Sequence, residues 1–394
     1  MTEIESINCK REKRGKYRDK IRGCLFGGAA GDALGYPVEF FSAAQIKAQY
    51  GRDGITSYRY APDGTALISD DTQMSLFTAN GVLIGDTRGS LRGIAAAPSS
   101  YVAMAYNDWL TTQTVSFDGF KKRRDDGQTD SICWLMEVPR LFALRAPGNT
   151  CLGALTEARS AGSSSDFIAD HRNDSKGCGG IMRIAPFSLF RYFPDLKRAD
   201  REAAQIAAIT HGHSLGFMPA AVLSHVINRL VYSGGTMTLK QAVTEARDTA
   251  SEIFAGDKHL KQLCDMIDLS VSLSENDEGD PANIARIGEG WVAEETLGIA
   301  IYCSLRHEND FSGGITAAVN HDGDSDSTGA VTGNILGAIC GYDAIEDKWK
   351  ERLELSDVIL EIADDLTYGC LMSEYGEYED PVWVEKYVYG RLKS

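Results

Sequence analysis

The chain has 394 residues, of which 43% are hydrophobic and 24% charged, so it is long enough to bury a large core and too apolar to be extensively disordered. Lysine and arginine total 40 against 56 aspartate and glutamate, which gives a formal net charge of −16 at pH 7. Because a nucleic-acid backbone is held by cationic surfaces, this charge argues against nucleic acid as the main partner.

The cysteines are scattered, odd in number and never spaced as Cys-x-x-Cys. This pattern argues against a zinc ribbon or a disulfide framework and fits a reducing cytoplasm. The N-terminus lacks the apolar core of a signal peptide, and no window reaches the ~18 uninterrupted apolar residues of a membrane span. We therefore expect a soluble cytoplasmic protein with no membrane partner.

Residues 1–20 are predicted to form a polar, basic N-terminal arm, because lysine and arginine dominate from Lys10 to Lys20. The arm is either a solvated helix start or a docking segment. From residue 21 onward, apolar residues recur mostly at helical spacing, without a β-α-β rhythm. The polar interruptions are too short to be domain linkers. We therefore predict an all-α fold, with a single multi-helix domain over residues 21–394.

Glycines repeat at every fourth position in two places. Gly23, Gly27, Gly31 and Gly35 form the first row, and Gly329, Gly333 and Gly337 form the second. A glycine inside a helix costs about 1 kcal/mol relative to alanine, unless its missing side chain lets two backbones approach closely. The rows therefore predict two tightly packed central helices, with glycine-rich loops as the alternative.

Two clusters of carboxylates each precede an apolar helical run. One is Ser69-Asp70-Asp71-Thr72, and the other runs from Asp322 to Thr328. Either cluster alone fits a helix cap, because carboxylates accept the free N–H groups of a helix start. Two clusters buried together would take up protons unless a cation compensated them, and oxygen ligands of this kind suit Mg²⁺, Mn²⁺ or Ca²⁺. The pair predicts a binuclear metal cleft.

Two other metal motifs fit the second cluster less well. An EF-hand loop starting at Asp322 would need glycine at Ser327 and glutamate at Gly333. A phosphatase of the aspartyl-phosphate type would use Asp324, Asp326 and Thr328, but that motif follows a strand and opens a long α/β domain. Only 68 residues (394 − 326) remain here.

With both clusters in view, the sequence resembles the ADP-ribosylglycohydrolase family, in its bacterial form. The resemblance spans roughly residues 20–370. The segments that carry it occur in the family's order: GCLFGGAAGDALGYPVEF, SDDTQM, RAPGNTCLGAL, KGCGGIMRIAPF, ITHGHSLGF, GEGWVAEETLGIAIY and HDGDSDSTG.

The resemblance implies an orthogonal all-α domain whose cleft holds two Mg²⁺ or Mn²⁺ ions and ADP-ribose. Its metal ligands would be Ser69, Asp70, Asp71, Asp324, Asp326 and Ser327. Glu39 matches the mobile acidic position that gates the cleft in relatives. Paired metals would orient the ribose and activate water for attack on an oxocarbenium-like centre. Asp324, or a metal-bound water aided by Asp71, would be the base, or Glu39 would be the acid/base; the sequence does not rank them.

The implied ADP-ribose contacts are Glu39, Gly177, Cys178, Gly179, Gly180, Met182, His211 and Asp322. Glycines allow a ligand to approach backbone N–H groups, although this loop also fits a simple turn. Many relatives have asparagine near Cys178. His211 fits the family's threonine-histidine element, with a structural histidine as the alternative. Lys176 and Arg183 are either phosphate-binding cations or packing charges.

The function implied is hydrolysis of the bond between ADP-ribose and a protein side chain, arginine first, with serine or threonine also open. O-acetyl-ADP-ribose and ADP-ribosylated nucleic acid are alternative substrates. An immunity or binding protein that blocks an ADP-ribosyltransferase is an alternative of a different class, and the basic arm would serve it.

Overall fold

The structure is a computed structural model, and it describes residues 2–161, 164–190 and 193–392. Over these ranges the regular elements are helices, and β-structure is limited to three isolated bridges. The prediction of an all-α protein is therefore confirmed.

The first half of the chain forms α1 (Glu3–Gly15), α2 (Arg18–Gly35), the 3₁₀ helix η1 (Tyr36–Val38), α3 (Ala43–Tyr50), α4 (Asp70–Arg92), α5 (Pro98–Thr114), α6 (Phe117–Asp125), η2 (Trp134–Glu137), η3 (Pro139–Leu141), α7 (Asn149–Ala161), η4 (Cys178–Gly180) and α8 (Ala185–Leu189). The second half forms α9 (Leu196–Ala208), α10 (Ser214–Tyr232), α11 (Leu239–Ile253), α12 (Leu260–Ser274), α13 (Asp280–Ile287), α14 (Ala293–Arg306), α15 (Phe311–Val319), α16 (Ser325–Cys340), α17 (Asp347–Lys350), α18 (Ser356–Tyr368) and α19 (Pro381–Tyr387).

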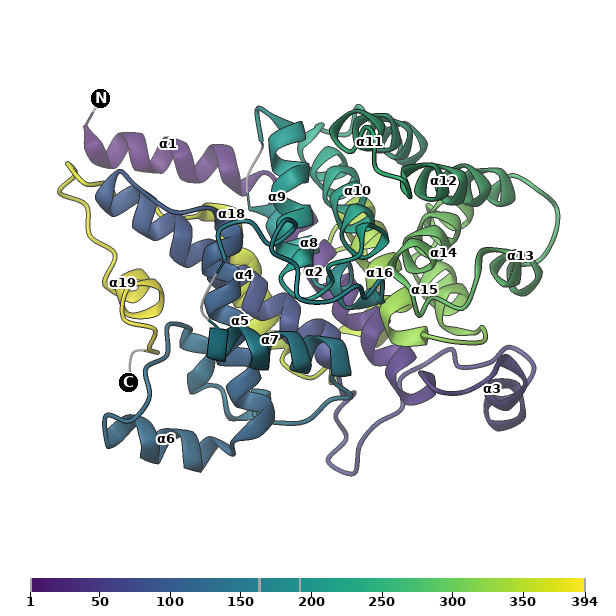
Figure 1. The fold of residues 1–394 in the computed structure, drawn as a ribbon, viewed down its shortest axis with the longest axis horizontal. Coiled ribbons are helices and arrows are strands. Elements are labelled where there is room, and N and C mark those ends of the chain that lie inside the picture. Colours follow the sequence, from purple (N-terminus) through teal and green to yellow (C-terminus); the bar gives the residue numbers. More distant parts are fainter. Residues whose placement is uncertain (1, 162–163, 191–192, 393–394) are drawn as a thin grey trace.

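Helices α2 and α16 cross the centre of the molecule against each other (Figure 1). Their glycine rows interlock in antiparallel order: a Cβ atom added at Gly23 would overlap the carbonyl oxygen of Gly337, and one at Gly31 would overlap that of Gly329. The predicted close packing of two glycine-rich helices is confirmed. Because the helices are antiparallel, the end of α2 lies beside the start of α16, where Gly35 meets the Ser325 carbonyl.

The remaining helices surround this pair. Helix α4 packs along α5 and reaches both central helices, whereas α14 and α15 pack on the other side of α16. Helices α11, α12 and α13 lie on the outer side of α14 in Figure 1. The main hydrophobic core is one continuous cluster that extends from Ile21 to Tyr387.

Residues 1–20 comprise α1 and the first residues of α2. Thr2 caps α1, and Ile7 is its buried residue. Helix α1 packs against α18, and the guanidinium groups of Arg18 and Arg22 both bind the carboxylate of Asp364. Both ends of the described chain lie at the same side of the molecule in Figure 1.

Within the described ranges, α10 is the helix long and apolar enough to cross a membrane by composition, with a mean hydropathy of 1.2. The protein itself covers 89% of this window, so the helix lies within the core.

Candidate active site

The C-terminal end of α2 organises the start of α4. Asp32 is fully buried, and its carboxylate accepts hydrogen bonds from the N–H groups of Ser69 (2.9 Å) and Thr72 (3.1 Å) and from the Thr72 hydroxyl. The Ser69 hydroxyl in turn accepts the Asp71 N–H as the N-cap of α4. The first carboxylate cluster is thus held on the end of a central helix.

The second cluster is the N-terminal turn of α16. The Asp324 carboxylate accepts the Ser327 N–H as the N-cap, and the Asp326 carboxylate accepts the same N–H at 3.0 Å. Because α16 begins beside the end of α2, these carboxylates meet Glu39, which directly follows η1. The antiparallel pairing therefore brings Glu39 near the first turn of α16, where the charges of Asp324 and Asp70 both act on it.

The carboxylates in this cluster repel one another. Burial, then the charges of Asp324 and Asp70, raises the pKa of Glu39 to about 9. Burial followed by the Asp32 charge raises the pKa of Asp70 and of Asp71 well above the usual range, and burial with the Asp71 charge does so for Asp326. The Ser327 hydroxyl, at the start of α16, opposes this rise in the pKa of Asp71 and so lies near the start of α4. Without a compensating cation, such a cluster would hold protons at neutral pH.

The donor set fits a hard cation. Oδ2 of Asp71 and Oε2 of Glu39 are buried and have no hydrogen-bond partner, as expected of oxygens that await a metal. The predicted ligands supply only carboxylate and hydroxyl oxygens, the ligands that Mg²⁺ and Mn²⁺ prefer. In the described part of the chain, no three Asp, Glu, His or Cys side chains already stand at ligand spacing around one point, so the carboxylates would have to draw closer around an ion.

The glycine loop lies against this cluster. Cys178 begins η4, its N–H donates to the Trp291 carbonyl, and its thiol donates to Oδ2 of Asp324 at 2.8 Å. Met182, four residues on, is buried and accepts a long hydrogen bond from the Ser327 hydroxyl at 4.0 Å. The loop predicted to bind ADP-ribose is thus anchored to the start of α16.

His211 lies beneath the same loop. A Cβ atom added at Gly179 would stand 2.7 Å from the His211 ring, so only glycine leaves room for it. A Cβ atom at Gly180 would come within 3.0 Å of both Ala207 and the Gly216 carbonyl. The close approach of the ring thus accounts for the glycine at 179, and helix packing accounts for the one at 180.

The two candidate phosphate cations have other partners. Lys176 forms an ion pair with the buried carboxylate of Glu294 at 2.9 Å. Arg183 is fully buried behind the loop and donates to the Thr210 hydroxyl. Of the two alternatives that the sequence left open, the structure places Arg183 among packing charges.

A cavity of about 630 Å³ opens beside the carboxylate cluster and is lined by Lys176, Trp291, Glu295 and Asp322, among others. Asp322 is exposed at its wall and caps α3 by accepting the Ala43 N–H at 2.8 Å. It therefore lies at the cavity wall and outside the buried carboxylate cluster. His321 is buried next to it, and its ring bonds the Asp322 carbonyl and the Thr328 hydroxyl.

Sequence reasoning missed two features of the site. Asp32 was identifiable as the one acidic residue in the segment GGAAGDALG, but its partners lie about 40 residues away. Phe40 is 71% exposed and stacks on Trp291, with ring centroids 5.8 Å apart. An exposed aromatic residue directly after Glu39 was the available signal, and only the tertiary structure shows its partner.

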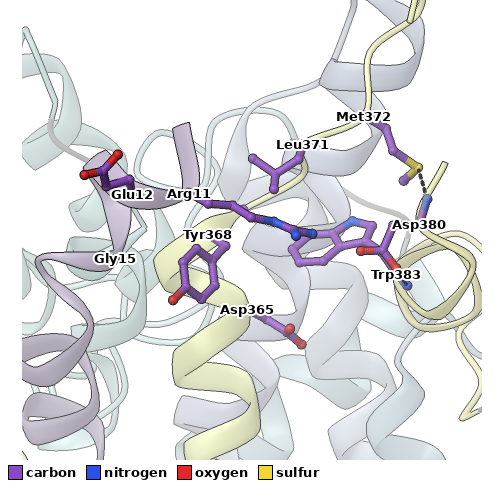
Figure 2. A pocket seen from close by; sticks show the side chains of 10 residues that line it. Arg11, Glu12, Gly15, Asp365, Tyr368, Leu371, Met372, Asp380 and Trp383 are labelled. Carbon is purple, nitrogen blue, oxygen red and sulfur yellow. Dashed lines mark hydrogen bonds between the residues drawn. The ribbon is translucent and has the colours of Figure 1, made fainter. Parts of the chain in front are cut away.

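A second cavity, of about 570 Å³, lies between α1, α18 and the segment before α19, and contains none of the predicted site residues (Figure 2). The Arg11 side chain extends across it towards Trp383, and its guanidinium donates to the Tyr378 hydroxyl at 2.8 Å. The carboxylate cluster therefore remains the candidate active site.

The model of the ADP-ribosylglycohydrolase family matches residues 13–376. An ADP-ribosyl-[dinitrogen reductase] glycohydrolase of Rhodospirillum rubrum is 23% identical, over 86% of this chain and 91% of that protein. The ADP-ribosylarginine hydrolase Tri1 of Serratia proteamaculans is 24% identical, over 89% of this chain and 79% of that protein.

Solved structures give the same fold. A chain of an ADP-ribosylglycohydrolase-related protein complex superposes with a TM-score of 0.60 at 22% identity, and the match covers 89% of this chain and 98% of that one. At this identity the likeness shows the fold alone.

Proposed function

The chain belongs to the ADP-ribosylglycohydrolase family, whose members hydrolyse glycosidic bonds of ADP-ribose, and we propose that it releases ADP-ribose from modified arginine side chains of proteins. Serine and threonine linkages are the alternative substrates. The observation that carries this proposal is the proximity of Glu39 to both carboxylate clusters, next to a cavity whose lining includes Asp322 and Glu289, the residue whose carbonyl accepts the Asp324 N–H.

We propose that two Mg²⁺ or Mn²⁺ ions are held by Ser69, Asp70, Asp71, Asp324, Asp326 and Ser327. When bound, such ions orient the ribose hydroxyls and lower the pKa of water. They would also relieve the repulsion that raises the carboxyl pKa values, because a nearby positive charge favours the ionised form.

The side chains supply proton transfer. Asp324 lies close enough to Asp71 for its charge to raise the pKa of Asp71, and either carboxylate would accept a proton from water. Glu39 is buried, and its Oε2 has no partner, so it is placed to hold a proton for the leaving group. The Gly177–Gly180 backbone, tied to Asp324 through the Cys178 thiol, and His211 would bind the ligand's oxygens.

The experiment is release of free ADP-ribose, measured by mass spectrometry, from peptides carrying arginine-, serine- or threonine-linked ADP-ribose. We expect release from the arginine peptide with Mg²⁺ or Mn²⁺, none with EDTA, and a loss of about 10³-fold in Asp324→Ala, since general acid–base groups contribute 10²–10⁴-fold. Asp357→Ala, at the surface on α18, is the matched control and should keep full activity.

Three outcomes would change the proposal. Release from serine alone would reassign the linkage. Activity that persists in EDTA would remove the metal ions from it. No release from any peptide would favour O-acetyl-ADP-ribose, modified nucleic acid or a role in blocking an ADP-ribosyltransferase.

A further inference from the structure

A fully buried arginine without a carboxylate partner lies behind the glycine loop. Arg183 is 0% exposed, and no carboxylate in the described ranges forms an ion pair with it. Its guanidinium lies 4.4 Å from the centre of the Tyr106 ring, and Nη2 donates to the Thr210 hydroxyl at 2.6 Å. A buried charge is costly, so its retention next to the site calls for a role.

The Thr210 hydroxyl also contacts the next residue. Its oxygen lies 2.8 Å from Nδ1 of His211. An arginine can only donate, whereas a hydroxyl has one proton and two acceptor positions. The bond from Arg183 therefore occupies an acceptor position and leaves the hydroxyl proton to be donated elsewhere.

Two acceptors are near that proton, Nδ1 of His211 and the sulfur of Cys151. Burial raises the pKa of Cys151 to about 11, so it remains a thiol, whose sulfur accepts hydrogen bonds weakly. A neutral imidazole nitrogen is the stronger acceptor. Donation by Arg183 also polarises the hydroxyl and strengthens its donation, because linked hydrogen bonds reinforce one another.

We propose that Arg183 is a positioning residue that acts through Thr210 to hold His211 as the tautomer with its proton on Nε2. In this arrangement Arg183 donates to Thr210, Thr210 donates to Nδ1, and Nε2 keeps the single ring proton. The chain of donors thus fixes the direction in which the histidine donates.

The Nε2 atom faces the glycine loop. Cβ atoms added at Gly177 and Gly179 would each lie 3.2 Å from it, and no described residue accepts a hydrogen bond from it. The Nε2–H group is therefore aimed at an acceptor that the protein does not provide. If the proposed function holds, on which this step rests, the acceptor is a phosphate or ribose oxygen of ADP-ribose.

The charge of Arg183 also adds to the effect of burial, which keeps the ring neutral. Burial, and then this charge, lowers the pKa of His211 to about 3. A protonated ring would carry a proton on Nδ1 as well, and the bond from Thr210 would be lost. The same cation therefore supports the neutral charge of His211 and, through Thr210, holds its tautomer.

The tautomer can be read by ¹⁵N NMR of the ligand-free protein labelled at histidine, with the signal assigned by its loss in His211→Gln. We expect an unprotonated Nδ1 and a protonated Nε2 in the wild type. Thr210→Ser should keep this pattern, because it keeps the hydroxyl. Thr210→Val and Arg183→Met should lose it, leaving a mixture of tautomers.

Binding of ADP-ribose, measured by calorimetry, tests the consequence. Thr210→Val should weaken binding about tenfold, the effect of one net hydrogen bond, and Thr210→Ser less than about twofold. Thr367→Val is the matched control: this buried threonine, on α18, donates to the Ala363 carbonyl of its own helix, and its loss should leave both measurements unchanged.

The proposal is overturned if His211 carries its proton on Nδ1 in the wild type, or if Thr210→Val keeps the wild-type tautomer. It is also overturned if Thr210→Ser fails to restore the pattern. Should the wild type bind no ADP-ribose, the proposed function would be at fault, because the tautomer is measured without ligand.

Discussion

At the scale of single residues, the described structure keeps several carboxyl groups out of water and compensates them with backbone N–H groups. Asp32 receives the N–H groups of Ser69 and Thr72 at the start of α4. Asp108, on α5, receives those of Ile132 and Cys133, both at 2.9 Å. Burial outweighs these bonds in each case and raises the pKa of both carboxyls to about 6.

Asp108 therefore makes stability depend on pH. Its native pKa lies above the unfolded value, so the folded chain binds the proton more tightly, and stability is lost as the pH rises from about 4 to about 6. Over this range the wild type should lose about 2–3 kcal/mol of unfolding free energy through Asp108. We expect Asp108→Asn not to show this loss. Urea unfolding of both proteins at pH 4 and pH 7 measures the difference.

Asp166→Asn is the control, because the pKa of Asp166 is shifted in the opposite direction to that of Asp108. Hydrogen bonds from Gln205 and the Ala169 N–H lower the pKa of this exposed carboxylate, so its small contribution is lost as the pH falls. Equal pH dependence of unfolding in Asp108→Asn and the wild type would show that Asp108 does not titrate in this range.

At the scale of elements, the α2–α16 pair determines where the site forms. The close approach of the two backbones depends on glycines at facing positions, as at Gly27 and Gly333. Their antiparallel order then sets the end of α2, with Glu39 beyond it, beside the first turn of α16. A change in this packing would therefore affect both stability and the carboxylate geometry.

A single methyl group tests this packing. In Gly31→Ala the Cβ atom would overlap the Gly329 carbonyl, which is backbone and cannot rotate away. Alanine gains about 1 kcal/mol in helix propensity, but overpacking at a backbone contact should cost about 3 kcal/mol or more and prevail. We expect a lower free energy of unfolding in urea.

Gly153→Ala is the matched control within α7, since nothing lies within 4 Å of its added Cβ atom. This variant should gain about 0.5–1 kcal/mol. If Gly31→Ala were also stabilised, the close approach of α2 and α16 would be wrong.

At the scale of the whole molecule, the site holds mutually repelling carboxyl groups at the meeting point of the central helices. Burial and the neighbouring carboxylates raise the pKa of Glu39 to about 9 and those of Asp70, Asp71 and Asp326 well above their usual range. The repulsion between these carboxyl groups therefore lowers the stability of the fold when no cation is present, as is common at functional sites.

Metal ions should therefore stabilise the protein. Ligand at 100 times its dissociation constant adds about 2.7 kcal/mol, which should raise the melting temperature by several degrees in Mg²⁺ or Mn²⁺ relative to EDTA. Asp71→Asn should melt higher than the wild type in EDTA and lose most of the rise caused by metal. Differential scanning calorimetry measures both.

The surface variant Asp357→Asn should respond to metal as the wild type does. A metal response that is unchanged in Asp71→Asn would place the bound ion elsewhere and remove Asp71 from the ligand set.

The sequence by itself determined the helical fold class, because the apolar period is local, and it identified the packed glycine helices, because repeated glycines inside a helix need a reason. The two carboxylate clusters and the glycine loop were also visible as local patterns. Family membership followed from their order along the chain.

Only the tertiary structure decided how these parts meet. The structural role of Asp32 is recognisable from the N–H groups that it accepts, about 40 residues away in the chain. That of Phe40 is recognisable from its stacking on Trp291. The burial of Arg183, on which the proposed donor chain to His211 depends, comes from Met74 of α4, Tyr106 of α5 and Cys151 of α7, which pack around its guanidinium. Hydrogen-bond direction and burial are properties of contacts between distant segments, and no local pattern of residues contains them.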